Sequence, residues 1–501
     1  MEFFSNLTMA FSVALQPNNL FFCFTGVLIG TLIGVLPGIG PVATISLLLP
    51  STFQITPVSA LIMLAGIFYG AMYGGSTTSI LVNIPGEAAS VVTCLDGYQM
   101  ARKGRAGPAL GISAFGSFIA GSLATIMIML IAPPLANMAL RFGPPEYFTL
   151  MFLGLTVLTY LASGSMVRAL MMACVGIFLG TIGTDTISGL ERFTYHSYTL
   201  MDGMGLVPVI MGLFGISEVL LNIDEQTTRR DVYETKLSNL FPNRKDWRAA
   251  ILPMVRGSLI GFFLGILPGG GAVIASFGSY AIEKKVSKHP EQFGHGAIEG
   301  VAAPEAANNA ASQGAFIPLL TLGIPANVVM AILLGALLIH GIKPGPLLMK
   351  QNADLFWGVI GSMYIGNVML LVLNLPLIGI WVKILKIPYP ILFPLILLFC
   401  LIGCYSLNNN VYEIIIMVGF GVIGFLMKKF RYEGAPLILA FVLSPLMENA
   451  LRQSLIMSRG DFSVFVTRPI ALVFFAAACF LLLSPLIPGF KKRPKEPPLE
   501  A

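Results

Sequence analysis

The strongest constraint on this chain is a succession of apolar segments, each close to the length of a membrane-spanning helix. Clear examples cover residues 20–36, 108–131, 205–221 and 355–374. A helix of about 20 apolar residues crosses the hydrocarbon core of a bilayer. Charged residues make up 11% of the chain, whereas soluble domains carry about 25%. These features exclude a soluble enzyme, a disordered protein and a nucleic-acid binder, and they predict a polytopic membrane protein.

The length and composition also predict how the chain is divided. At about 20 residues per span, the chain has room for roughly 10–12 transmembrane helices. Its 53 Gly and 33 Pro residues favour re-entrant or broken helices within an all-α bundle. The predicted parts are an amphipathic lead-in (1–17), a first membrane repeat (18–221), a cytoplasmic linker (222–248), a second membrane repeat (249–487) and a basic, disordered cytoplasmic tail (488–501).

The two predicted repeats share three motifs in the same order. Each motif alone is weak, but the spacing between the two copies is nearly constant. The pairs are Ile33–Val42 with Leu264–Val273 (231 residues apart), Ile84–Gly86 with Ile324–Ala326 (240 apart), and Gly107-Pro108 with Gly345-Pro346 (238 apart). We interpret this pattern as an internal duplication.

Charge exchange between equivalent loops predicts that the repeats are inverted. The loop at 50–56 is uncharged, whereas its counterpart at 283–288 is rich in Lys. The balance is reversed after the next motif, where the first repeat has three basic residues at 102–105 and the second has only Lys343. Because basic loops stay in the cytoplasm, equivalent loops are expected on opposite sides of the membrane. Arg452, Arg459 and Arg468 fit this scheme poorly and are assigned to the external face.

Signatures of enzymes and of metal or disulfide sites are missing from the sequence. No G-x-S-x-G, H-E-x-x-H or G-x-x-x-x-G-K-[ST] motif occurs. The six cysteines are scattered through mostly apolar segments without C-x-x-C spacing, so they predict neither disulfides nor a metal centre. We therefore expect a protein that is not an enzyme and has no resident cofactor.

Breaks rich in Pro and Gly are the first candidate binding elements. Pro removes a helix donor and Gly permits unusual backbone angles, so amides and carbonyls are freed from the helix. Such groups either belong to a structural kink or line a binding site, and their pairing at matching positions favours a site. Half-helix N-termini attract carboxylates, whereas freed carbonyls bind Na⁺. The substrate-binding candidates here are Gly38, Gly40, Pro85, Gly86, Gly269, Gly270, Gly271 and Pro325.

Small polar residues beside these breaks are the second set of candidates. A polar break in the helix is expected at Gly75–Thr78. A helix over 303–313 would place Glu305, Asn308, Asn309 and Ser312 on one face, either for binding or for interhelical hydrogen bonds. The substrate-binding candidates are Ser76, Thr77, Thr78, Asn83, Asn308, Asn309, Ser312, Gln313 and Asn327. Glu305, with backbone carbonyls near Pro37 and Pro268, is the candidate Na⁺ site.

At these motifs the sequence resembles the large membrane subunit of the tripartite tricarboxylate transporter family (TctA-like). The resemblance covers roughly residues 18–460. Two departures are Ala326 in place of Gly after the second Ile-Pro, and Gln99 in place of Pro after Gly97-Tyr98. The motifs that carry it are Gly30–Pro41, Tyr73–Gly75 with Ile80–Gly86, Asp96–Tyr98, Leu267–Tyr280 and Glu299–Pro346.

This resemblance implies a function and a set of partners. Such proteins lie in the bacterial inner membrane with a small four-helix membrane subunit (TctB-like), and a periplasmic solute-binding protein (TctC-like) delivers the substrate. They import citrate-like di- and tricarboxylates by symport with an ion, usually Na⁺, without ATP. Similarity to related transporters implies an elevator-type mechanism of alternating access. The alternative from the residues alone is a single-component channel or exporter of small organic anions.

Overall fold

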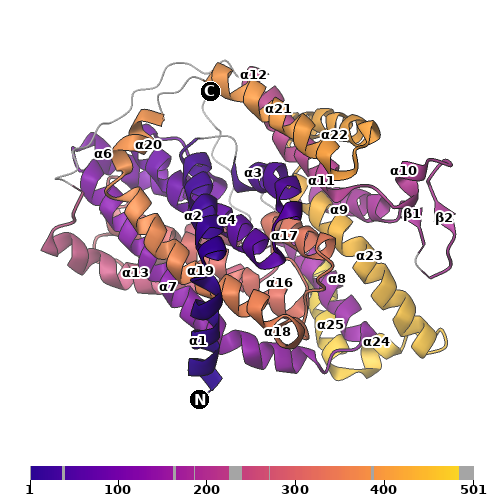
Figure 1. Cartoon of the computed structure of the whole chain (residues 1–501). Coiled ribbons are helices and arrows are strands. Elements are labelled where there is room, and N and C mark those ends of the chain that lie inside the picture. Colours follow the sequence, from indigo (N-terminus) through magenta and orange to yellow (C-terminus); the bar gives the residue numbers. More distant parts are fainter. Residues whose placement is uncertain are drawn as a thin grey trace.

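The computed structural model of the chain is almost entirely helical, which confirms the all-α polytopic prediction (Figure 1). It describes residues 2–36, 40–161, 165–185, 187–224, 240–269, 271–384 and 389–484. Within these ranges, 7 helices are long and apolar enough to cross a membrane, and shorter apolar helices accompany them. Most of the predicted linker (225–239) and the predicted tail lie outside the described residues, so these two predictions stay predictions.

The first half of the chain contains two kinds of element, long apolar helices and short connecting segments. The helices are α1 (Glu2–Ala14), α2 (Pro17–Val35), α3 (Gly40–Leu48), α4 (Pro57–Val82), α5 (Val91–Thr93), α6 (Gln99–Arg102), α7 (Ala106–Ala139), α8 (Pro144–Leu161), α9 (Met166–Gly180), α10 (Tyr198–Met201), α11 (Leu206–Ile210) and α12 (Ser217–Asp224). The remaining elements are the 3₁₀ segments η1 (Leu49–Gln54) and η2 (Ala88–Ser90), the π-helical segments η3 (Cys94–Tyr98) and η4 (Met211–Ile216), and the antiparallel strands β1 (Gly183–Thr184) and β2 (Glu191–Arg192).

The second half contains a similar mixture of long apolar helices and short segments. They are α13 (Arg244–Ile266), α14 (Gly271–Val286), α15 (Glu299–Gly314), α16 (Phe316–Leu322), α17 (Val328–Ile339), α18 (Leu348–Gln351), α19 (Ala353–Asn374), α20 (Ile378–Ile384), α21 (Tyr389–Asn408), α22 (Val411–Lys429), α23 (Gly434–Met457), α24 (Val464–Thr467) and α25 (Pro469–Leu483), with the 3₁₀ turn η6 (Pro290–Gln292).

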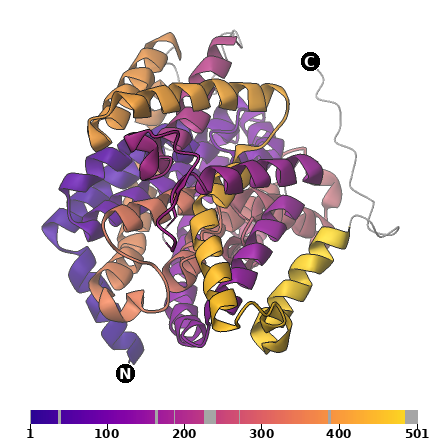
Figure 2. The ribbon, with the colours of Figure 1, turned by 90° about the vertical axis from the view of Figure 1, so that its right-hand side faces the viewer.

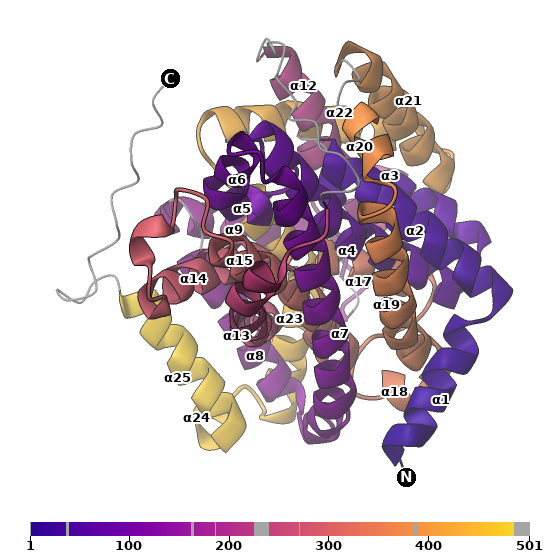
Figure 3. The ribbon, with the colours of Figure 1, turned by 90° about the vertical axis from the view of Figure 1, so that its left-hand side faces the viewer.

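Two helix pairs form the densest packing in the molecule, α2 with α4 and α13 with α15. Figure 3 shows the second pair side by side. Along α2, a Cβ at Gly26, Gly30 or Gly34 would lie 2.3–2.5 Å from a backbone oxygen of α4. Along α13, a Cβ at Gly257, Gly261 or Gly265 would lie 2.2–2.3 Å from a backbone oxygen of α15. Only glycine permits so close an approach of two helix backbones.

The contacts within these two pairs follow the spacings of the shared sequence motifs. The three α13 glycines lie 231 residues after the three α2 glycines. Their α15 partners Ala303, Ala307 and Ala311 lie 240 residues after the α4 partners Met63, Ile67 and Ala71. The inverted orientation of the repeats stays a prediction.

Helices end at each of the four predicted Pro-Gly breaks. α2 ends at Val35 and α13 ends at Ile266, each just before its Pro-Gly motif. α4 ends at Val82 and α16 ends at Leu322, and the residues that follow them, Asn83 and Gly323, lie 240 residues apart and adopt a left-handed conformation with φ of 59° and 71°. Such a residue commonly ends a helix. We refer to 83–87 and 323–327 as the first tip and the second tip.

The predicted break at Gly75–Thr78 is wrong, because α4 continues through it to Val82. The polar side chains find partners without leaving the helix. Ser79 Oγ donates to the Gly75 carbonyl oxygen (3.0 Å), and Thr78 Oγ1 donates to the Val35 carbonyl oxygen at the end of α2 (2.7 Å). The side-chain hydroxyls therefore bind backbone carbonyl oxygens inside the bundle, where no water is needed to satisfy them. The helix does not have to open at these polar residues.

Helices α9 and α23 pack side by side and run in the same direction. Near their first residues, Arg168 donates to the Phe430 carbonyl oxygen (3.1 Å) and lies over the Tyr432 ring. Further along, Ser444 Oγ donates to the Ile177 carbonyl oxygen (3.0 Å). Lys428, Lys429 and Arg431 gather where these helices begin, so we call this the basic end of the molecule. The β1–β2 hairpin follows the other end of α9.

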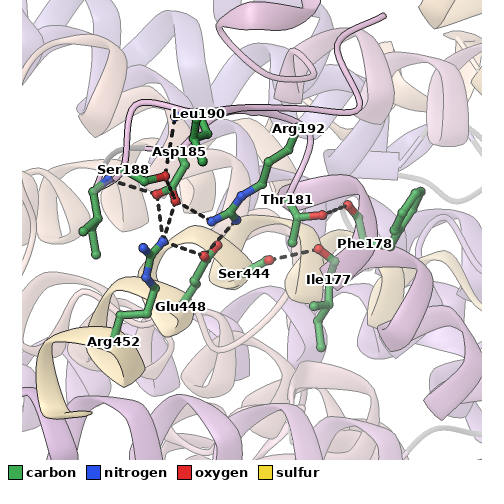
Figure 4. Close-up of polar contacts among 11 residues, drawn as sticks. Ile177, Phe178, Thr181, Asp185, Ser188, Leu190, Arg192, Ser444, Glu448 and Arg452 are labelled. Carbon is green, nitrogen blue, oxygen red and sulfur yellow. Dashed lines mark hydrogen bonds and ion pairs between the residues drawn. The ribbon is translucent and has the colours of Figure 1, made fainter. Parts of the chain in front are cut away.

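An ion-pair network fixes the β1–β2 hairpin to the second half of α23 (Figure 4). The Asp185 carboxylate, with 5% of its side chain exposed, binds Arg192 at 2.6 Å and Arg452 at 2.7 Å. Arg192 also binds Glu448 at 2.8 Å. The hairpin itself lies at the front of the molecule in Figure 2. The Arg452 guanidinium, with help from Ser188, holds the pKa of Asp185 well below its ordinary range.

We expect Gly261→Val to destabilise the chain by on the order of 1–3 kcal/mol, because the new side chain would collide with the backbone of α15. Thermal unfolding of the detergent-solubilised protein measures the loss. Gly419→Ala in α22 is the matched control, since its Cβ would meet no atom within 4 Å. Equal stability of the two variants would contradict the packing of α13 on α15.

We expect the hairpin to stay anchored near neutral pH and to be released in acid. A carboxylate whose pKa is lowered by folding stabilises the fold above its unfolded pKa, about 3.9 for Asp. This contribution is lost as the pH falls below that value. The protection of the amides of residues 187–192, which is their exchange rate relative to the intrinsic rate at the same pH, should therefore fall below about pH 4. Asp185→Asn should show fast exchange already at pH 7, whereas Asp202→Asn should behave like the unaltered chain.

Candidate functional site

The Glu305 carboxylate lies at the centre of the molecule, fully buried in α15. One carboxylate oxygen accepts a hydrogen bond from Ser76 Oγ of α4, and the other accepts one from Thr93 Oγ1 of α5. Both hydroxyl donors are themselves buried. In the described part of the chain, no Lys or Arg forms an ion pair with this carboxylate. Two neutral donors thus hold a buried acidic group to which no cationic side chain is paired.

The two asparagines that follow on α15 each form side-chain hydrogen bonds through the amide nitrogen and not through the amide oxygen. Asn309 Nδ2 donates to Ser117 Oγ of α7 (2.7 Å) and to the Glu305 carbonyl oxygen (3.0 Å). Asn308 Nδ2 donates to Glu87 Oε1 in the first tip (3.1 Å). The Oδ1 atoms of both asparagines are buried and accept no hydrogen bond from any described residue. A buried acceptor without a donor is costly, and a bound cation is one species that satisfies it.

The last polar residues of α15 are occupied by helix packing. Gln313 Oε1 accepts from Thr125 Oγ1 of α7 (2.6 Å), and its Nε2 donates to Asn367 Oδ1 of α19 (3.2 Å). Ser312 Oγ donates to the Asn309 carbonyl oxygen (2.9 Å). The sequence allowed two roles for the polar face of α15, binding and interhelical hydrogen bonds, and the structure has features of both. The C-terminal part of this face makes interhelical contacts, and its middle leaves oxygen atoms unpaired.

The first tip packs tightly against the helices that precede it. A Cβ at Gly86 would lie 2.0 Å from the Gly34 carbonyl oxygen, so the tip requires glycine there. Glu87 caps η2 through its Oε2, which accepts from Ala89 N (2.6 Å). Asn83 is exposed at the left-handed end of α4. The other candidates here are Thr77, which is buried, and Pro85, which is partly buried.

The second tip contacts the Pro-Gly break that precedes it in the same half. Gly269 N donates to the Ala326 carbonyl oxygen (2.8 Å), and Pro325 beside it is buried. Asn327 Oδ1 accepts from Met330 N (3.0 Å) and so caps α17, which gives this side chain a structural role. Gly271 begins α14 in the left-handed region with φ of 49°.

Gly40 at the start of α3 also adopts a left-handed conformation, with φ of 65°. Three candidates, Pro37, Gly38 and Gly270, lie outside the described residues.

The predicted site residues therefore form one central cluster and one separate group. Glu305, Asn308 and Asn309 of the second half meet Ser76 and Glu87 of the first half. Among the described residues, no hydrogen bond joins the first tip to the second tip. Sequence reasoning missed Thr93, Ser117 and Asn367, whose one visible signal was a polar residue within an apolar stretch.

Asp96 joins the two halves next to this cluster. Its Oδ1 accepts from the backbone amides of Gly294, Gly296 and Ala297 (2.7–2.9 Å), and its Oδ2 accepts from Tyr280 Oη (2.9 Å). The side chain lies in the π-helical segment η3 and is fully buried. Converging backbone amides form an anion-binding concavity, and here the chain fills it with its own carboxylate.

Comparisons with known proteins show which chains this one is similar to. A family model described as the tripartite tricarboxylate transporter TctA family matches residues 20–439. The "Uncharacterized 52.8 kDa protein in TAR-I ttuC' 3'region" of Agrobacterium vitis is 54% identical over 493 residues, which cover 98% of each chain. The "Uncharacterized protein in TAR-II ttuC' 3'region" of the same organism is 54% identical over 233 residues, which are 46% of this chain and 96% of that protein. No solved structure matches the chain.

We expect Asp96→Ala to destabilise the protein by about 3 kcal/mol or more, since each buried donor left unsatisfied costs about 1–3 kcal/mol. Asp96→Asn should cost less, because its amide oxygen still accepts the three backbone N–H groups. Thermal unfolding in detergent measures both losses. Equal losses of stability in the two variants would show that the hydrogen bonds from the three backbone amides do not account for the stabilisation by Asp96.

Proposed function

Because the chain belongs to the tripartite tricarboxylate transporter TctA family, we propose that it is the large membrane subunit of a binding-protein-dependent secondary transporter. It imports di- or tricarboxylates such as citrate across the bacterial inner membrane. Its partners are a small four-helix membrane subunit (TctB-like) and a periplasmic solute-binding protein (TctC-like). A gradient of Na⁺ drives the import, without ATP and without any reaction on the substrate.

The observation that carries the ion-coupling part of this proposal is the set of oxygen atoms around Glu305. A carboxylate, two hydroxyls and the unpaired Oδ1 atoms of Asn308 and Asn309 lie in one buried region between the halves of the chain. Hard cations such as Na⁺ prefer oxygen ligands of these kinds. A bound cation would also neutralise Glu305, which no basic side chain pairs with in the described ranges. The residues therefore fit a coupling ion.

The packing supports an elevator-type movement as the transport step. Three of the helices that end at the breaks belong to two tightly packed pairs, α2 with α4 and α13 with α15, and Glu305 joins one pair to the other. A cation at this junction would hold both pairs together as one body. We propose that this body carries the substrate past the remaining helices while the ion is bound.

We expect Glu305→Gln to reduce Na⁺-driven uptake by at least about tenfold, because the variant keeps the shape of the side chain but loses one charge-assisted ligand. The measurement is uptake of a panel of labelled carboxylates into proteoliposomes that contain the chain with its membrane partner, with the solute-binding protein added outside, at several Na⁺ and pH gradients. Glu299→Gln, at the start of the same helix, is the matched control and should retain uptake.

The same experiment separates the alternatives. Full Na⁺-dependent uptake by Glu305→Gln would refute the proposed ion site. Uptake that follows the pH gradient and ignores Na⁺ would replace Na⁺ by a proton. Uptake by the chain alone, with no requirement for the solute-binding protein, would favour a single-component carrier or channel.

A further inference from the structure

A cavity of about 520 Å³ lies next to the second tip, away from the cluster around Glu305. Three parts of the fold enclose it: the start of α8 with the residues before it, the α16–α17 connection with the following turn, and the second half of α23. Its volume is in the range of pockets for small organic molecules, about 300–1,000 Å³. Gly323 and Ile324 of the second tip, with Leu322 at the end of α16, form part of its wall.

Among the described residues that line this cavity, one is charged, Lys343. The side-chain amides of Asn449 and Gln453 add polar groups, and most of the remaining wall is apolar. In the ranges that the structure describes, no carboxylate forms an ion pair with Lys343. The nearby Glu146 is instead bound to Arg468, Nε to Oε1, at 2.5 Å. Lys343 is exposed, so an anion can reach its ammonium group from outside, and the apolar wall beside it makes their attraction stronger than in bulk water.

The repeat gives Lys343 a counterpart for comparison, Arg105, which lies 238 residues earlier, the spacing of Gly107-Pro108 and Gly345-Pro346. The Arg105 guanidinium binds the Asp246 carboxylate at the start of α13, so it connects the two halves of the chain. Lys343 lies instead at the cavity, in a turn that packs directly on the second tip. A Cβ at Gly323 would lie 2.9 Å from the Pro344 carbonyl oxygen. The two related basic residues therefore have different surroundings.

The direction of α23 places the cavity in one half of the molecule. This helix starts near Lys428, Lys429 and Arg431 at the basic end and reaches the cavity at Asn449 and Gln453. If the basic end faces the cytoplasm, the cavity lies in the external half. An imported anion would meet it before reaching Glu305.

We propose that this cavity is the receiving site for the imported carboxylate, in which Lys343 binds one carboxylate group and the apolar wall contacts the carbon skeleton. This inference rests on the proposed function and names the group that recognises the substrate. It applies to any small organic anion that presents a carboxylate to Lys343. A fatty acid from the bilayer has the same head group, so the experiment must distinguish these two sources.

The first arm measures the kinetics of uptake in proteoliposomes that contain the complete transporter, with the best substrate of the unaltered protein. Lys343→Gln should raise the apparent KM by about tenfold or more, and Lys343→Arg should restore most of the loss. Lys350→Gln, a lysine outside the cavity, is the control and should keep the KM. An unchanged KM in Lys343→Gln, while the unaltered protein transports, would overturn the receiving site but not the proposed function.

The second arm measures binding without transport. Gln453→Cys places a thiol in the cavity wall of a chain whose own cysteines are replaced, and a membrane-impermeant maleimide labels it from outside. The carboxylate should slow this labelling, and Lys343→Gln should abolish the protection. Arg459→Cys, beyond the cavity, should be unprotected. Protection by a fatty acid but by no small carboxylate would overturn the proposal in favour of a lipid site. Absence of uptake by the unaltered complex would instead refute the proposed function.

Discussion

The architecture depends on the burial of one polar helix, α15, inside a membrane protein. Its middle carries Glu305, Asn308 and Asn309, which cannot face lipid at an acceptable free-energy cost. The glycines of α13 let that helix approach the backbone of α15 so closely that a Cβ would lie 2.2–2.3 Å from its carbonyl oxygens. Helices α4, α7 and α14 cover other parts of its surface. The glycine contacts thus create an enclosed position, and that position makes a buried carboxylate possible.

The two repeats share their packing but not their chemistry. The residue that lies 240 positions before Glu305 is Ala65, and the residue 240 positions after Ser76 is Phe316. One repeat thus provides the carboxylate and the other provides a hydroxyl donor for it. A symmetric pair would have placed two carboxylates or two apolar groups at equivalent positions. The two repeats share the glycine contacts of α2 with α4 and of α13 with α15, but they differ at the positions of Glu305 and Ser76. This difference makes the buried contact between the two side chains possible.

The sequence allowed some features to be predicted because their physical cause is local. Proline lacks a backbone donor, so the ends of α2 and α13 could be placed beside Pro37 and Pro268. The polar face of α15 followed from helical spacing alone. The continuity of α4 through Gly75–Thr78 was not predictable in this way. It depends on an acceptor at the end of α2 that the local sequence does not reveal.

The partners of Glu305 were also beyond prediction, for a related reason. Thr93 and Ser76 reach it from two different elements, and only the crossing of these elements with α15 decides which hydroxyls arrive. Asp96 is similar, because its three amide donors come from a loop nearly 200 residues away. A polar residue in an apolar stretch indicates that some partner exists, but spacing along the chain does not identify it.

The ion pairs bear on the one part of the charge pattern that did not fit the predicted orientation. Arg452, Arg459 and Arg468 were assigned to the external face, where unpaired basic residues are disfavoured. In the structure, Arg452 binds Asp185 and Glu448, and Arg468 binds Glu146. The positive charges of Arg452 and Arg468 are therefore balanced by acids, of which Asp185 and Glu146 come from distant parts of the chain. Lys428 also has an acidic partner, Glu218, but the adjacent Lys429 and Arg431 add positive charge at the basic end. The excess of positive charge consequently stays at the end predicted to be cytoplasmic, which favours an external position for the Lys343 cavity.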